Sequence, residues 1–132
     1  MKSRVSIVAQ HQPGSGNRLP VRLAFWLLDR PRLGHHSSIK HFAGRLLKQP
    51  ARQGVVAAQS RLGQLLCRDC GNARDRRIGL ELLRQAARAG DARAQLELGR
   101  LHCQPQQARH WLGLAAAQGS QEAARLLQRL NP

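Results

Sequence analysis

The chain has 132 residues, the size of one ordinary domain, which argues against a two-domain enzyme. It contains no Tyr, two Phe and two Trp while Leu and Ala are abundant, so we expect a core of small aliphatic side chains between close-packed helices. Its formal charge of +15, from 22 Lys and Arg against seven Asp and Glu, favours an acidic partner.

The cysteine count indicates the compartment. Three cysteines are an odd number and no secretory leader precedes them, so we expect a reducing, cytoplasmic environment rather than a disulfide framework. The apolar run at 21–28 is interrupted by Arg22 and is too short to span a bilayer. Asp29-Arg30-Pro31 follows it where a small-residue cleavage site is expected, so the run does not predict a signal peptide.

Residues 1–20 hold a polar Gln-Pro-Gly-Ser-Gly-Asn stretch with little periodicity. This composition predicts a disordered or loosely attached leader. Positive charge is densest in the first part of the chain. Residues 1–54 carry ten Lys or Arg and one acid, Asp29, whereas residues 55–132 carry twelve and six.

Residues 21–54 are expected to form two helices. The first covers Val21–Asp29 and is ended by Pro31 and Gly34. The second begins at a serine cap, Ser37 or Ser38, and Pro50 limits its extent. Its buried face follows a three-four spacing and comprises Ile39, Phe42, Ala43, Leu46 and Leu47.

The most informative feature is the self-similarity between residues 58–90 and 94–119. Three short motifs recur in the same order, two of them at a spacing of 36 and the third at a spacing of 29. They are Ala58-Gln59 with Ala94-Gln95, Leu62-Gly63 with Leu98-Gly99, and Ala86-Ala87 plus Gly90 with Ala115-Ala116 plus Gly119. We assign the seven-residue difference to a loop, Cys67–Ile78, which is shortened around Gln104 and Pro105.

Each copy predicts two amphipathic helices whose apolar residues follow helical spacing. In the first copy these residues are Ala58, Leu62, Leu65 and Leu66, then Gly79, Leu82, Leu83, Ala86 and Ala87. In the second copy they are Ala94, Leu98 and Leu101, then Ala108, Trp111, Leu112, Ala115 and Ala116. Gly90 and Gly119 are expected to form left-handed helix caps. Gly63 and Gly99 lie within helices, so we expect a close approach of neighbouring helices there.

These patterns predict an all-α fold, a right-handed α/α superhelix built as a solenoid of helical hairpins. The expected organisation is a leader at 1–20, a degenerate first hairpin or N-terminal cap at 21–54, and repeats at about 55–90 and 91–119. A C-terminal capping helix at 120–131 completes the region 55–132. With so few repeats, we expect the N-terminal helices or self-association to cover the apolar ends.

The pattern resembles the Sel-one-like repeat, a relative of the tetratricopeptide repeat in which Ala and Leu-Gly precede a Gly- and Asp-containing loop, then Ala, Trp, Ala-Ala and Gly. The matching residues of the first copy are Ala58, Leu62-Gly63, Gly71, Asp75, Gly79, Leu82, Ala86-Ala87 and Gly90. Those of the second are Ala94, Leu98-Gly99, Ala108, Trp111, Ala115-Ala116 and Gly119. Leu66 and His102 replace the usual Tyr, and Leu82 replaces the usual Trp.

The resemblance implies a non-catalytic scaffold or adaptor that binds another protein on a surface lined by first helices. Polar first-helix positions, which we expect to be exposed, are therefore the expected partner contacts: Arg61, Gln64, Arg68, Glu97 and Arg100. No Gly-rich phosphate loop, nucleophile elbow or paired carboxylates appear, so we expect no enzyme activity and no cofactor. Asp75 is read as a helix-start residue.

Two other hypotheses compete with protein binding. One is a zinc site, for which Cys67, Cys70 and Cys103 are the candidate ligands and His102 is the neighbour of Cys103. Adjacent residues on a helix point about 100° apart, which argues against His102 and Cys103 binding the same ion. Nucleic-acid or polyanion binding is the alternative function, because an arginine patch suffices for phosphate contact. That patch comprises Arg74, Arg76, Arg77, Arg84 and Arg88.

Overall fold

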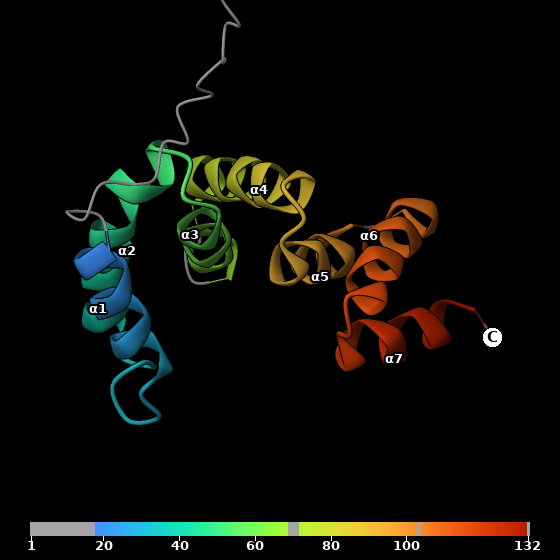
Figure 1. Ribbon diagram of the computed structural model, residues 1–132, viewed down its shortest axis with the longest axis horizontal. Coiled ribbons are helices and arrows are strands. Elements are labelled where there is room, and N and C mark those ends of the chain that lie inside the picture. The colour runs from blue at the N-terminus through green and yellow to red at the C-terminus, as the bar shows by residue number, and fades with distance from the viewer. Residues whose placement is uncertain (1–17, 69–71, 103, 132) are drawn as a thin grey trace, which may run out of the picture.

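The computed structural model describes residues 18–68, 72–102 and 104–131, and every regular element in these ranges is an α-helix (Figure 1). The helices are α1 (Arg18–Asp29), α2 (Ser37–Arg52), α3 (Val56–Arg68), α4 (Ala73–Arg88), α5 (Ala92–Leu101), α6 (Pro105–Ala117) and α7 (Gln121–Leu130). The predicted all-α class is confirmed for this part of the chain. None of these helices is long and apolar enough to cross a membrane.

The helices follow one another along the molecule, from α1 and α2 at one end to α6 and α7 at the other (Figure 1). Each helix packs against the next in the chain, and α3 also contacts α5, which contacts α7. Alanine and leucine dominate the core, as the composition predicts. Most residues expected to be apolar and inward-facing are buried or partly buried, but Phe42 is 48% exposed, so its assignment to the buried face of α2 was wrong.

Three helices end in the same way, at Gly54, Gly90 and Gly119. The backbone φ angles are +86°, +97° and +97°, a left-handed conformation that favours glycine. At each turn the glycine N–H donates to the carbonyl three residues back, and the next residue donates to the carbonyl five residues before it. This is a Schellman motif, so the predicted caps at Gly90 and Gly119 are confirmed, and Gly54 adds a third.

Pro50 lies inside α2, which continues to Arg52, so the prediction that this proline limits the helix was wrong. In the last turn a missing N–H removes only one helical hydrogen bond. The Pro50 carbonyl still accepts from the Val55 N–H at 3.0 Å, and the ring is buried. The predicted serine cap is also wrong, because His36 occupies the N-cap position without a side-chain hydrogen bond.

The first helix begins three residues earlier than the periodicity predicts. Residues 18–20, which the composition places in the leader, belong to α1, while residues 1–17 lie outside the described part of the chain. A similar correction applies between the two similar regions. The predicted loop Cys67–Ile78 is largely helical, because α3 reaches Arg68 and α4 begins at Ala73.

Helix length accounts for most of the difference in spacing between the two copies. The first helices, α3 and α5, have 13 and 10 residues, and the second helices, α4 and α6, have 16 and 13. Six of the seven residues are therefore lost from the helices rather than from one loop.

The mid-helix glycines mark close contacts, as expected. A Cβ atom at Gly63 would lie 2.8 Å from Leu83 Cγ and 2.9 Å from the carbonyl oxygen of Gly79. A Cβ atom at Gly99 would lie 2.5 Å from Leu112 Cγ. Leu83 and Leu112 are 29 residues apart, so α3 and α5 each accommodate a corresponding leucine from the helix that follows.

Two buried glutamines connect α3 to α2 and α5 to α4. The Gln59 side chain donates to the Ala51 carbonyl at 3.2 Å, and Gln95 donates to the Ala87 carbonyl at 3.2 Å. Both are under a tenth exposed and reach the last turn of the preceding helix. A buried amide without partners would cost about 1–3 kcal/mol, so these bonds favour one placement of each helix over another. The Ala-Gln pair recurs in the sequence because both glutamines make this contact, but helical periodicity alone does not show that these side chains hydrogen-bond to the preceding helix.

Candidate functional site

Four of the five residues expected to contact a partner meet around Glu97. The Glu97 side chain is 3% exposed and accepts hydrogen bonds from Gln64 Nε2 at 3.1 Å, Arg68 Nε at 3.2 Å and an Arg100 nitrogen at 2.9 Å. Arg100 also pairs with Glu122 of α7. These contacts join α3, α5 and α7. Most of the residues expected to contact a partner therefore form hydrogen bonds or ion pairs within the molecule itself.

The expectation that all five residues are exposed was therefore wrong. Glu97 is buried, and Gln64 and Arg61 are half-buried, which leaves only Arg68 and Arg100 exposed. Arg61 lies apart from the Glu97 cluster. Its guanidinium pairs with Asp29 of α1 at 2.7 Å. Sequence periodicity identifies which face these residues share, but it does not show that acids and bases on neighbouring helices neutralise one another.

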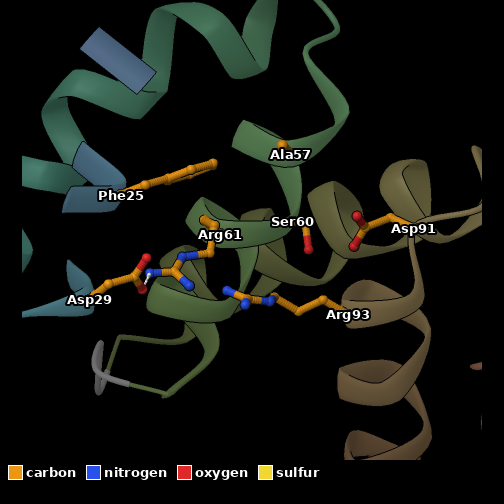
Figure 2. A pocket seen from close by; sticks show the side chains of 7 residues that line it. All are labelled: Phe25, Asp29, Ala57, Ser60, Arg61, Asp91 and Arg93. Carbon is orange, nitrogen blue, oxygen red and sulfur yellow. Dashed lines mark hydrogen bonds and ion pairs between the residues drawn. The ribbon is translucent and has the colours of Figure 1, made fainter. Parts of the chain in front are cut away.

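Arg61 lines a small pocket of about 140 Å³ at the junction of α1, α3 and the start of α5 (Figure 2). Figure 2 shows the Arg61 side chain directed at Asp29, with Arg93 reaching from α5 toward the same space. Asp91 also lines the pocket and caps α5 by accepting from the Ala94 N–H at 2.8 Å. The two arginines are balanced by two aspartates, so this pocket does not select a ligand by charge.

A larger groove of about 790 Å³ lies between α2, α3 and the beginning of α4. Its charged side chains are mostly basic, with Asp75 as the one acid among the described lining residues. The basic residues are Lys40, Arg45, Lys48, Arg52 and Arg74, and His35 and His41 also line the groove. The large apolar side chains of the lining are Leu62, Leu65, Leu66, Ile78 and Leu82. The lining therefore has a basic part and an apolar part, and we name the five basic side chains the rim and the five apolar side chains the floor of the groove.

Local structure explains how this groove is formed. α2 is held on α3 by Leu47 and Ala51, which are buried in a core shared with Leu62. Gly44 leaves space one turn away, where a Cβ atom would still be 3.9 Å from Leu62 Cδ1. On the other side, Asn72 caps α4 by accepting from the Arg74 N–H at 2.9 Å. This cap begins the helix close to the groove, where Arg74 and Asp75 both line it.

The sequence did not identify this groove. Its composition gave one indication, since residues 1–54 carry ten basic residues and one acid. Four of the five basic residues that line the groove come from α2, within this part of the chain. The apolar floor comes from α3 and α4, and only the packing of three helices brings both features together. Of the residues assigned to a polyanion patch, only Arg74 lines the groove.

The other four members of that patch lie farther along α4. Arg76, Arg77 and Arg88 are exposed, while Arg84 is half-buried and sits 3.8 Å from Glu81. They line neither of the two described cavities. Positive charge alone is therefore the feature that this part of α4 offers to a ligand.

The zinc alternative depends on residues that are not described. Cys70 and Cys103 lie outside the described ranges, and Cys67 is half-buried with its Sγ 3.7 Å from the Arg76 carbonyl oxygen. Within the described ranges, no group of three His, Cys, Asp or Glu side chains could hold a metal ion. Burial lowers the pKa of His102, and the nearby Arg84 charge lowers it further.

Comparison with known proteins adds no family assignment. A scan of the chain against protein-family models gives no match, and no curated protein matches its sequence. Between the two cavities, the groove is the larger and has charge of predominantly one sign. Its geometry is therefore the basis for a functional inference.

Proposed function

We propose that this protein binds an acidic, amphipathic segment of another protein in the groove between α2, α3 and α4, as a non-catalytic interaction module. The observation that carries the proposal is the combination of five basic side chains with a floor of leucine and isoleucine. An amphipathic segment would bury its apolar face on that floor and place its carboxylates at the rim. Ile78 is 45% exposed here, so apolar surface is accessible to a ligand.

We also propose that α3–α4 and α5–α6 are two Sel-one-like hairpins stacked as a solenoid, with α7 as the terminal cap and α1–α2 as a divergent first hairpin. Three matching Schellman turns support this, at Gly54, Gly90 and Gly119. The equivalent contacts of Gln59 and Gln95 support it as well. In this arrangement the groove lies between the first hairpin and the second.

Polyanion binding is the second candidate, favoured by the exposed arginines that continue from the groove along α4. Nucleic acid is bound mainly through phosphates, with aromatic rings stacking on unpaired bases. The groove lining contains histidine rings but no Phe or Trp, and its floor is aliphatic. An aliphatic floor stabilises an apolar peptide face but gives little to a phosphate backbone.

A peptide selection tests the proposal. Peptides from a displayed random library are selected on the full chain, and their affinity is measured by fluorescence anisotropy. We expect the selected peptides to carry acidic residues and apolar residues at helical spacing. A scrambled peptide of the same composition should bind at least on the order of tenfold more weakly, because it lacks an apolar face. Equal binding of both peptides would instead favour a polyanion site.

Matched variants separate the groove from general electrostatics. Arg45→Glu/Lys48→Glu should abolish peptide binding, whereas Arg125→Glu/Arg129→Glu on α7 makes the same change in net charge outside the groove. Ile78→Ser should weaken binding of the peptide but leave binding of a mixed-sequence single-stranded DNA probe unchanged. If the α7 variant loses as much peptide affinity as the α2 variant, the groove is not the binding site.

A further inference from the structure

The outer face of α1 exposes a stripe of large apolar side chains. Leu19, Leu23 and Trp26 are 72%, 45% and 50% exposed, and their spacing of four and three residues places them on one face of the helix. Ala24 and Leu27 are buried on the other side, so α1 is already anchored to the molecule. The exposed stripe is therefore not needed to hold the helix in place.

Positive charge borders this stripe. Arg18, Arg22 and Arg30 are exposed, and the Arg30 guanidinium lies 4.2 Å from the centre of the Trp26 ring. The one acid of α1, Asp29, is paired with Arg61. An approaching surface therefore meets apolar side chains edged by arginines.

We propose that this face docks on an anionic lipid surface, with α1 lying in the plane of the membrane interface. Leu19, Leu23 and Trp26 would enter the boundary between headgroups and acyl chains, while the arginines contact lipid phosphates. Leucine and tryptophan combined with basic residues are typical of interfacial helices, and tryptophan favours this depth of the bilayer. Arginine can keep its charge at the phosphates while its aliphatic part remains in the apolar layer.

Charge argues against a second copy of the chain as the occupant. A two-fold dimer through this face would bring the bordering arginines of the two copies close together, between chains that each carry a formal charge of +15. A helical peptide is also disfavoured, because such ligands lie in grooves and neither described cavity includes Leu19, Leu23 or Trp26. An anionic bilayer offers a flat apolar layer and opposite charge together.

Vesicle binding by the full chain tests this proposal. The probes are phosphatidylcholine vesicles with and without phosphatidylglycerol, used in co-sedimentation and in fluorescence on a Trp111→Phe background, in which Trp26 is the one remaining tryptophan. We expect binding only to the phosphatidylglycerol vesicles, with a blue shift of Trp26 emission. Leu19→Ser/Leu23→Ser should reduce binding at least on the order of tenfold.

The basic residues have a matched control. Arg18→Gln/Arg22→Gln should also weaken vesicle binding, whereas Arg125→Gln/Arg129→Gln, which removes the same charge from α7, should bind nearly as the parent does. Circular dichroism and thermal melting establish that each variant folds, and if the leucine variant does not fold, the arginine pair decides.

Three results would overturn the proposal. One is no binding to anionic vesicles, and another is equal loss in the α1 and α7 charge variants. The third is a concentration-dependent dimer in sedimentation velocity that Leu19→Ser/Leu23→Ser abolishes, which would assign the stripe to a second copy.

Discussion

Gly63 and Gly79 approach each other across α3 and α4, where either Cβ atom would lie 2.9 Å from the other residue's carbonyl oxygen. A helix normally loses about 1 kcal/mol when alanine is replaced by glycine. That cost is offset here because Leu83 packs directly over Gly63. The space beside each glycine therefore decides whether a methyl group added there would stabilise or destabilise the protein.

Two glycine variants test this contrast. Gly63→Ala should destabilise the protein by about 1–3 kcal/mol, because its methyl group would overlap Leu83 and the Gly79 carbonyl. Gly113→Ala, in α6, should stabilise it by up to about 1 kcal/mol, since a Cβ atom there would meet nothing within 4 Å beyond its own helix and chain neighbours. Urea unfolding measures both, and a destabilised Gly113→Ala variant would contradict the explanation.

A single residue, His102, should also make the stability of the protein depend on pH. Its pKa is lowered in the folded protein, first by burial and then by Arg84, so the unfolded chain binds the proton more readily. The stabilising contribution is present above the unfolded pKa of about 6.5 and is lost as the pH falls below it. His102→Gln should therefore reduce the loss of stability between about pH 7 and pH 5. Unfolding curves across this range measure the difference, and an unchanged pH dependence would exclude His102 as its source.

At the scale of elements, Glu97 joins α5 to α3 through its bonds to Gln64 and Arg68, and Arg100 continues the network to Glu122 on α7. The carboxylate is almost fully buried, whereas the Arg68 side chain is 47% exposed and can regain water if the contact is lost. The network therefore sets the relative placement of three helices more than it stabilises any single one.

Substitution of Glu97 tests this role. Glu97→Ala should destabilise the protein by about 1–3 kcal/mol, because it leaves Arg68 and Arg100 close together without their shared acceptor. Glu81→Ala is the control, since Glu81 is 54% exposed and 3.8 Å from Arg84, and it should change stability by less than about 0.5 kcal/mol. Equal effects in chemical denaturation would mean that the buried network adds nothing beyond a surface ion pair.

At the scale of the whole molecule, α1 and α2 cover the apolar side of α3. Ala58 and Leu62 of α3 are buried in the same core as Ala24, Ala43 and Leu47. Leu65 and Leu66 pack against this core and also line the groove. The N-terminal helices thus complete the core, and α2 also forms one wall of the proposed binding site.

Removal of residues 1–54 should therefore lower the melting temperature or cause aggregation, because it exposes the apolar face of α3. Leu47→Ala tests the same interface without truncation. Leu47 is fully buried, so its loss should cost about 2–5 kcal/mol. An unchanged thermal melt for the truncated chain would show that the remaining helices are self-sufficient.

The sequence alone predicted the features that depend on neighbouring residues. All the described helices were expected, most of them from apolar side chains at helical spacing, and Gly90 and Gly119 identified two left-handed turns, because periodicity and backbone freedom are local properties. Helix ends were less accurate. Pro50 stayed in α2 since its ring packs into the core and its carbonyl still bonds to Val55.

Only the tertiary structure decided which polar residues are buried, which of them pair with one another and which line the groove. Glu97 looked like an exposed position, yet basic side chains on two helices make its burial favourable. The groove likewise needs the cations of α2 beside the leucines of α3 and α4. Charge pairing and cavity shape depend on distances between residues far apart in the chain, and helical periodicity describes only the face on which each residue lies.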